Sequence, residues 1–200
     1  MLGSARAGAF AVEGASGVAL RTWVEDVLRF WLEETASETW FRKDAAFDQD
    51  LRQRFLQTHA TVKSLALEAC LTDANTALAA VIVLDQFSRN LFRDTPQAFA
   101  CDAAALSLAQ AAIAKGFDAQ VSARARLFFY LPFEHAEDLA AQSRCVALMA
   151  TLADPELVKW AEAHKQIIDR FGRFPHRNAV LGRTSTPQEV AFLAQPGSAF

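Results

Sequence analysis

Apolar residues recur at helical spacing along nearly the whole chain, and this pattern constrains the fold more than any other feature. One stripe at i, i+3, i+4 and i+7 predicts a helix over about residues 21 to 34; it comprises Val24, Val27, Leu28 and Trp31. A similar repeat predicts a long helix over about residues 44 to 71. Residues 77 to 84 are apolar on every side, which is typical of a fully buried helix. Because period-two alternation is nearly absent, we predict an all-α fold.

Capping residues and helix breakers predict where the later helices begin and end. Thr186 and Glu189 fit a capping box at the start of a short last helix. Other predicted boundaries are a start at residues 94 to 96, stops at Gly116 and Pro132, a helix reaching Asp154, and one from Asp154 to Gly172. We therefore expect about eight helices, in antiparallel hairpins that form either a superhelical stack or an irregular bundle.

Length and composition predict a single folded domain. The chain has 200 residues, of which 52% are hydrophobic, enough for one well-buried core. Residues 1 to 20 are rich in Gly, Ala and Ser, and Glu13 interrupts them, so a secretory signal is not expected. We predict a disordered leader over residues 1 to 20 and one all-helical domain over residues 21 to 200.

Charge and cysteine content limit the classes of partner and compartment. A net charge of −3 provides no overall field that would attract nucleic acid or an acidic membrane, and we find no apolar run of about 18 residues. The three cysteines are far apart in helix-like sequence, so we predict buried, reduced thiols and a cytoplasmic location. We expect no nucleic-acid partner, no membrane and no disulfide framework.

Two polar clusters interrupt apolar sequence. The first, residues 85 to 90, follows the most apolar helix, and Asp85 and Arg89 are spaced to meet on one face. The second, residues 134 to 138, follows Pro132, where we expect the chain to turn and a new helix to begin with acids in its first turn. His135 lies between Glu134 and Asp138, which could fix its tautomer and raise its basicity. A helix-end ion pair and dipole-stabilising acids are the corresponding structural interpretations.

A third cluster lies near the C-terminus. It contains His176 and four arginines, namely Arg170, Arg173, Arg177 and Arg183. Guanidinium groups suit carboxylates and phosphates because they present two parallel donors. These arginines either neutralise acids of the first two clusters, or some remain available to bind an anionic ligand. Phe171 and Phe174 are predicted core anchors, and His164 is predicted to be a core histidine.

Neither a metal nor another cofactor is predicted. The four histidines are scattered, the paired Glu-x-x-His motifs of dinuclear bundle sites are missing from the sequence, and the nearby arginines would repel a cation. The sequence also lacks a glycine-rich phosphate loop, a dinucleotide fingerprint and an evident activated serine or cysteine. The four tryptophans fall beside apolar residues at helical spacing, so we predict that all of them pack in the core.

Several ordered motifs resemble the bacterial domain-of-unknown-function family 924. They are Val27-Leu28-Arg29-Phe30-Trp31, Trp40-Phe41-Arg42-Lys43-Asp44, Leu84-Asp85-Gln86-Phe87, Phe128-Phe129-Tyr130-Leu131-Pro132 with Glu134-His135, and Phe171-Gly172-Arg173-Phe174-Pro175-His176-Arg177-Asn178. The resemblance covers about residues 24 to 200 and implies an all-helical fold similar to tetratricopeptide superhelices. The chain departs from the family pattern at Ser88, where proline is usual, and at Asp94, where glycine is usual.

The resemblance and the clusters together define a candidate site, which requires that the three motifs converge in space. The candidate binding residues are Asp85, Gln86, Arg89, Asn90, Glu134, His135, Asp138, Arg173, His176, Arg177 and Asn178. We expect a polar pocket that binds an anionic small molecule or the acidic group of a protein partner. The alternative is a metal-independent enzyme in which His135 or His176, oriented by a carboxylate, acts as general acid or base.

Overall fold

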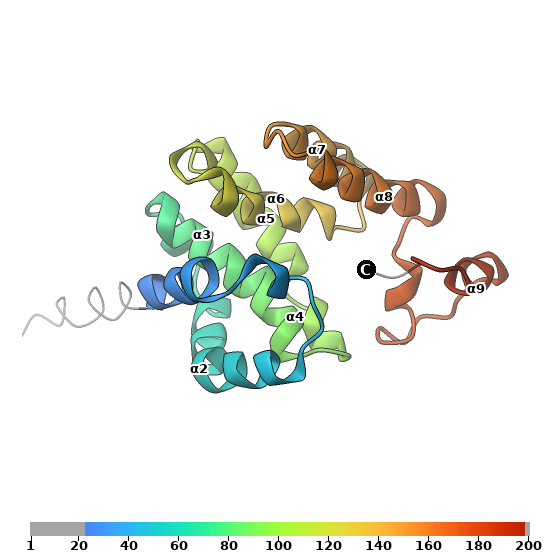
Figure 1. Cartoon of the computed structure of the whole chain (residues 1–200), viewed down its shortest axis with the longest axis horizontal. Helices are drawn as coiled ribbons and strands as arrows, with labels where there is room; N and C mark the ends of the chain where they lie inside the picture. The colour runs from blue at the N-terminus through green and yellow to red at the C-terminus, as the bar shows by residue number, and fades with distance from the viewer. Residues whose placement is uncertain (1–22, 199–200) are drawn as a thin grey trace, which may run out of the picture.

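The computed structural model describes residues 23–198, and within that range every regular element is a helix (Figure 1). The predicted all-α fold is therefore confirmed, and the helices α2 to α9 of the described residues pack as a bundle. The leader predicted over residues 1 to 20 lies outside the described residues.

The N-terminal half is built around one buried helix. Residues 23 to 28 are helical and continue as a π-helical turn, η1 (Arg29–Glu34). Next come α2 (Ala45–Lys63) and α3 (Ala74–Ile82), and α3 runs through a second π-helical turn, η4 (Val83–Phe87), into α4 (Ser88–Leu91). As predicted, the helix containing residues 77 to 84 is buried on all sides. Helix α2 packs against η4 and α4.

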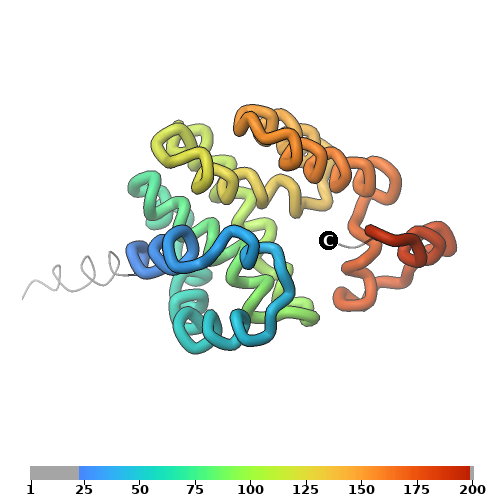
Figure 2. Tube along the Cα trace, viewed as in Figure 1, coloured from blue at the N-terminus to red at the C-terminus, as the bar shows by residue number. Residues whose placement is uncertain are grey.

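The C-terminal half consists of four longer helices and a terminal segment. Helices α5 (Asp102–Ala114), α6 (Ala123–Glu134), α7 (Leu139–Ala150) and α8 (Pro155–Phe171) each pack against the next in sequence. Gly172 then ends α8 with φ 68°, as its position predicts. Beyond it lie the 3-10 turn η7 (Pro175–Arg177) and α9 (Pro187–Leu193), which has the predicted capping box. Figure 2 shows this C-terminal segment beside the end of α8.

Several predicted helix boundaries are wrong. The helix expected to start at residues 94 to 96 is preceded by a 3-10 turn, η5 (Pro96–Phe99), and α5 starts only at Asp102, while the helix expected to reach Asp154 ends at Ala150. The helix expected over residues 44 to 71 ends at Lys63, since the Ser64 hydroxyl donates to the Thr61 carbonyl at 2.7 Å and the chain then forms a separate 3-10 turn, η3 (Leu67–Cys70). Helix α6 passes through Pro132, because proline φ suits a helix and the burial of residues 127 to 134 stabilises it against the lost N–H bond. Glu134 and His135 therefore end α6 and do not begin α7.

Aromatic rings fill the main core. Trp31 is fully buried and packs against Trp40, Phe87 and Phe128, with ring centroids 5.4 to 6.4 Å apart. Trp160 contradicts the prediction that all tryptophans are buried, because it is 50% exposed on α8. The three cysteines are free thiols and are buried, as expected.

Helix α5 also belongs to the core. The stretch of residues 96 to 114 is, by length and composition alone, apolar enough to cross a membrane, although we found no such run by inspecting the sequence. In the structure α5 packs against α3 and α6 and buries Ala105, Leu108, Ala109 and Ala112. A core helix of a folded domain has the same composition.

Candidate functional site

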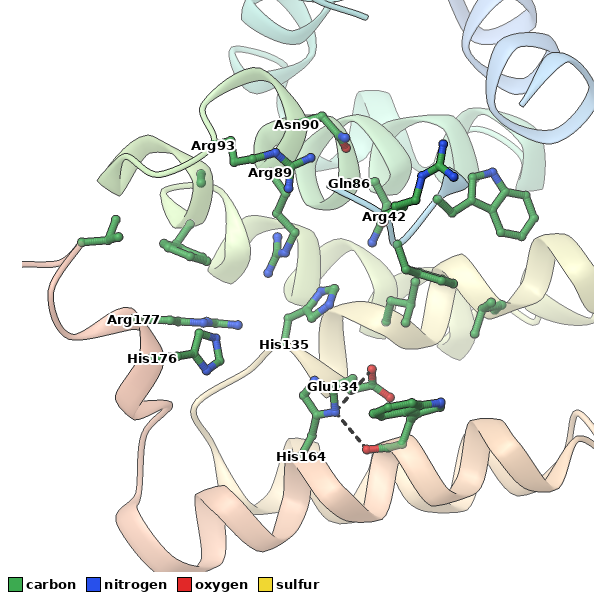
Figure 3. A pocket seen from close by; sticks show the side chains of 18 of the residues that line it. Arg42, Gln86, Arg89, Asn90, Arg93, Glu134, His135, His164, His176 and Arg177 are labelled. Carbon is green, nitrogen blue, oxygen red and sulfur yellow. Dashed lines mark hydrogen bonds and ion pairs between the residues drawn. The ribbon is translucent and has the colours of Figure 1, made fainter. Parts of the chain in front are cut away.

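A cavity of about 680 Å³ lies where α4, the end of α6, α8 and the C-terminal segment meet. Its wall includes residues from all three polar clusters, so the motifs converge. The candidate residues that line it are Gln86, Arg89, Asn90, Glu134, His135, His176 and Arg177. Figure 3 shows Arg89, His135, Arg177 and His176 pointing toward a shared space, with Glu134 beside them.

The π-helical turn η4 places Asp85 behind the cavity wall. A π turn adds a residue to the helical repeat and often marks a functional position. Asp85 is only 1% exposed. Its carboxylate accepts a hydrogen bond from Gln86 Nε2 at 2.6 Å and forms an ion pair with Arg89 Nη1 at 3.2 Å. Burial opposes ionisation, but Arg89, His135 and Gln86 outweigh it and hold the Asp85 pKa well below its usual range.

The carboxylate of Asp85 orients His135. His135 Nδ1 lies 2.8 Å from Asp85 Oδ1 and 3.0 Å from Oδ2, and since this acceptor is ionised, Nδ1 carries the proton. The sequence predicted this role for Glu134 or Asp138, which lie closer to His135 in the chain. That prediction is wrong, because the side chains of both acids face other groups. Burial, with a further contribution from Arg89, lowers the His135 pKa, so the ring is neutral at pH 7.

A single carboxylate, that of Asp102 at the start of α5, joins the first and third clusters. Arg89 donates to it from Nη1 at 3.0 Å and from Nη2 at 3.1 Å, and Arg177 Nη1 donates to it at 3.2 Å. The two guanidinium groups are therefore held close together around one negative charge. Arg89 also donates to the Asp85 carbonyl, so its donors are well satisfied.

Arg177 is satisfied much less completely. Its side chain is 7% exposed and lies between the rings of Phe99 and Phe174, 4.7 and 4.5 Å from their centroids. Among the described residues its one hydrogen bond goes to Asp102, and the buried Nε donor has no partner. Burial and the nearby Arg89 lower its pKa to about 10, so it remains charged at pH 7.

Glu134 is a buried carboxyl group that stays protonated. Burial, and then the charge of Asp85, raise its pKa to about 8. His164 Nδ1 lies 3.7 Å from Glu134 Oε1 and 2.9 Å from the Trp160 carbonyl (Figure 3). Gln142 on α7 fixes the backbone of this turn, since its Nε2 donates to the Glu134 carbonyl at 2.6 Å and to that of Ala136 at 2.9 Å.

Two other histidines of the cavity wall, His164 and His176, are also held neutral. Burial is the main cause that lowers the pKa of His164 to about 3 and that of His176 to about 4. Arg177 lowers both values further, which reflects how closely these rings surround the same guanidinium group. His164 is the core histidine predicted from sequence, but it also forms part of the cavity wall.

Besides Asp85, which lies behind the wall, three candidate residues do not line the cavity. Arg173 binds Glu189 on α9 through Nε at 2.6 Å and Nη2 at 2.8 Å. Asp138 caps α7 by accepting from the Ala141 N–H at 2.7 Å. Asn178 donates to Ser185 and accepts from Arg183 Nε at 2.9 Å. Each of these side chains stabilises a turn or a helix end.

The remaining arginines of the C-terminal cluster are likewise engaged. Arg183 forms a two-pronged ion pair with Glu137, at 2.6 and 2.9 Å, while Arg170 stacks on the ring of Phe171. Neutralisation by acids of the first two clusters describes only Arg183, since Arg173 pairs with Glu189, which lies outside both clusters. Arg177 retains unused donors.

Sequence reasoning missed several residues of the site. Asp102 looks like an ordinary first-turn acid of an alanine-rich helix, so no local signal marks it. Arg93 faces the cavity and pairs with Asp48 at 2.6 Å, across 45 residues of sequence. Trp160 and Phe99, which line the cavity, resemble core residues in the sequence.

Metal-binding geometry is missing from this region. Within residues 23–198, no group of three or more His, Cys, Asp or Glu side chains is arranged to hold a metal ion.

Fold and site together define an all-helical protein with a partly enclosed cavity walled by arginine, histidine and a buried carboxyl group. Residues 27–197 match the family described as bacterial protein of unknown function (DUF924), and the chain belongs to that family. A solved structure, that of the protein of unknown function ATU0120 from Agrobacterium tumefaciens, is 42% identical to this chain. The match covers 87% of this chain and 98% of that one, with a TM-score of 0.82. No curated protein matches the chain.

Proposed function

We propose that the cavity binds a small organic molecule through an anionic group, either a carboxylate or a phosphate. The observation that supports this most directly is Arg177. Leaving a buried donor of a charged group unbonded is costly, and here the Nε donor has no partner among the described residues. An anion bound against this guanidinium group would supply the missing acceptor.

The charges of the cavity wall favour an anion. Four guanidinium groups line it, and the acids that pair with them lie outside the lining; the arginines are Arg42, Arg89, Arg93 and Arg177. Of the two acids that do line it, Asp94 pairs with Lys43, and Glu134, with a pKa of about 8, is uncharged at pH 7. In a partly enclosed site of low dielectric constant, the resulting positive potential attracts anions more strongly than it would on the surface.

The rest of the wall suits an apolar body. It includes Trp160 together with Leu127, Leu131, Met149 and Leu157. The volume of about 680 Å³ lies within the range of about 300 to 1,000 Å³ that is usual for small-molecule sites. These features favour a small amphipathic anion over the acidic group of a protein partner.

Thermal unfolding of the full chain in the presence of candidate anions tests the proposal. The panel comprises inorganic phosphate, nucleoside monophosphates, and aliphatic and aromatic carboxylates. We expect at least one of these classes to raise the melting temperature. Arg177→Met should lower the affinity about 10- to 100-fold, since it removes hydrogen bonds to a charged group.

The matched control is Arg29→Gln, which removes an exposed arginine that pairs with Asp26 away from the cavity. Its anion affinity should equal that of the wild type. If no anion in the panel stabilises the protein, or if both substitutions weaken binding equally, the proposed site is wrong. Stabilisation by acidic peptides alone would favour the partner interpretation.

A further inference from the structure

The His135–Asp85 pair leaves one ring nitrogen of His135 facing the cavity. Nδ1 is bonded to Asp85, and Nε2 forms no hydrogen bond with any described residue although His135 lines the cavity. A neutral imidazole with a protonated Nδ1 has its lone pair on Nε2. The lone pair therefore faces the same space as the unused donors of Arg177.

Protonation of Nε2 would be stabilised where it occurs. An imidazolium formed at His135 would lie against the ionised, buried carboxylate of Asp85, which is itself fixed by Gln86 and Arg89. A carboxylate in this position orients the ring and stabilises its charged form, as in other acid–base sites. Asp85 thus acts as a positioning residue and His135 as the group that would touch the ligand.

Glu134, the adjacent residue, has the opposite protonation behaviour. Its carboxyl group is buried, lines the cavity and keeps its proton at pH 7, so it can donate. When two titratable groups in one site have environments that drive them toward opposite roles, one is suited to act as base and the other as acid. His176, the other candidate from sequence, lies beside Arg177 on the opposite wall, where the arginine disfavours its protonation.

We propose that this cavity is a metal-independent acid–base active site, in which His135 removes a proton from a small organic anion and Glu134 donates one to it. This inference rests on the proposed function, since the substrate is the bound anion. It names a reaction class: proton transfer that isomerises the substrate or eliminates water from it.

Protons and electrons balance in the proposed reaction. His135 Nε2 takes a proton from a C–H group of the substrate next to a carbonyl or carboxylate, and the electron pair of that bond stays on the substrate. Arg177 stabilises the negative charge that develops, while the Glu134 O–H gives its proton to the accepting or departing oxygen. In an elimination, the proton on His135 then returns through water to the Glu134 carboxylate. In an isomerisation, His135 gives its proton to the neighbouring carbon of the enediol and the Glu134 carboxylate takes the proton of the other hydroxyl, so neither route needs an oxidant or reductant.

Two measurements test the inference on the full-length protein. Long-range ¹H–¹⁵N correlation spectra at pH 7 should show His135 protonated at Nδ1 and bare at Nε2. Proton exchange in D₂O should then be followed by ¹H NMR with pyruvate and with dihydroxyacetone phosphate. Each probe has an anionic group and a C–H bond acidified by a carbonyl. We expect the protein to exchange the C–H protons of at least one probe above the buffer rate.

Variants separate catalysis from folding. His135→Gln should reduce exchange by about 100-fold or more, the usual contribution of a general base, while Arg29→Gln should not change it. Asp85→Asn should lower the rate and convert His135 to the Nε2-protonated tautomer, because an amide can donate to Nδ1. A merely structural role for Asp85 would leave the tautomer unchanged.

The outcomes distinguish this inference from anion binding. A charged or Nε2-protonated His135 at pH 7, or no exchange of probes that raise the melting temperature, would overturn the acid–base role and leave the anion site standing. If His135 shows the predicted tautomer but no anion raises the melting temperature, the proposed function is overturned, and with it the substrate class.

Discussion

At the scale of single residues, Asp102 decides how much positive charge the cavity presents. Its carboxylate is shared by Arg89 and Arg177, and within residues 23–198 the two arginines have no other common acid at hydrogen-bonding distance. Arg89 also pairs with Asp85, whereas the ion pair of Arg177 is with Asp102, whose charge it shares with Arg89. The anion site therefore depends on an acid that is itself outside the cavity lining.

The substitution Asp102→Asn tests this charge balance. Losing one partner of a mostly buried ion pair should lower the free energy of unfolding by about 2 to 4 kcal/mol. Anion affinity should increase, because Arg177 would keep its charge and lose its partner Asp102, while Arg89 would still pair with Asp85. Urea denaturation and anion titration measure the two effects, and a variant that is both less stable and weaker in binding would contradict this account.

The raised pKa of Glu134 predicts that the stability of the fold depends on pH. The unfolded chain releases this proton near pH 4.5, whereas the folded protein keeps it until about pH 8. Between these values the folded state binds more protons, so the free energy of unfolding falls as pH rises. Each pH unit in this window lowers the free energy of unfolding by about 1.4 kcal/mol at most.

Glu134→Gln removes that dependence. The unfolding free energy of the variant, minus that of the wild type, should grow between pH 5 and pH 8 by about 1 to 4 kcal/mol. Urea denaturation at several pH values measures the difference. If the difference stayed constant over this range, Glu134 would not be a protonated acid at neutral pH.

At the scale of elements, the continuation of α6 through Pro132 brings Glu134 and His135 into the cavity. A turn at Pro132, as the sequence suggests, would have placed them in the first turn of α7. The first residue of α7 is instead Leu139, and Asp138 is its N-cap. The acid that resembled a site residue in the sequence thus has a local structural role.

Asp138→Ala distinguishes capping from ligand binding. Losing the N-cap hydrogen bond to Ala141 should lower the free energy of unfolding by about 1 kcal/mol. Anion affinity should not change, because Asp138 does not line the cavity. Chemical denaturation and the anion titration described above measure both quantities, and a large loss of affinity in a folded variant would return Asp138 to the site.

At the scale of the whole molecule, the C-terminal segment supplies one wall of the cavity. Glu137, between α6 and α7, holds this segment in place by accepting two hydrogen bonds from Arg183 and one from the Phe174 N–H at 2.8 Å. Phe174 is fully buried beside Ile167 and Ile168. This anchoring positions His176 and Arg177 on the cavity wall.

Glu137→Ala should loosen that segment. We expect faster amide hydrogen exchange over residues 173 to 183, a loss of about 2 to 3 kcal/mol in unfolding free energy, and weaker anion binding. The control is Glu156→Ala, which removes an exposed ion pair with Lys159 and should change none of these. Unchanged exchange over residues 173 to 183 would show that Glu137 does not anchor the segment.

The outline of the fold was predictable because its signals are local. Apolar spacing identified the buried helix α3, and a positive-φ glycine ended α8 where the sequence placed it. Asp94 has φ 60°, which explains why glycine is usual at this position of the family pattern. The boundaries at Ser64 and Pro132 were wrong because tertiary burial and a side-chain bond outweighed local propensity.

By itself, the sequence determined the helical class, most caps, and which short segments contain the unusual polar residues. Only the tertiary structure decided which acid meets which base: His135 pairs with Asp85 across 50 residues, and Arg177 with Asp102 across 75. Helix periodicity depends on neighbours within a few residues, and the sequence records it directly. Charge pairing depends on how whole helices pack, so the unused donors of Arg177 became visible only once the chain was folded.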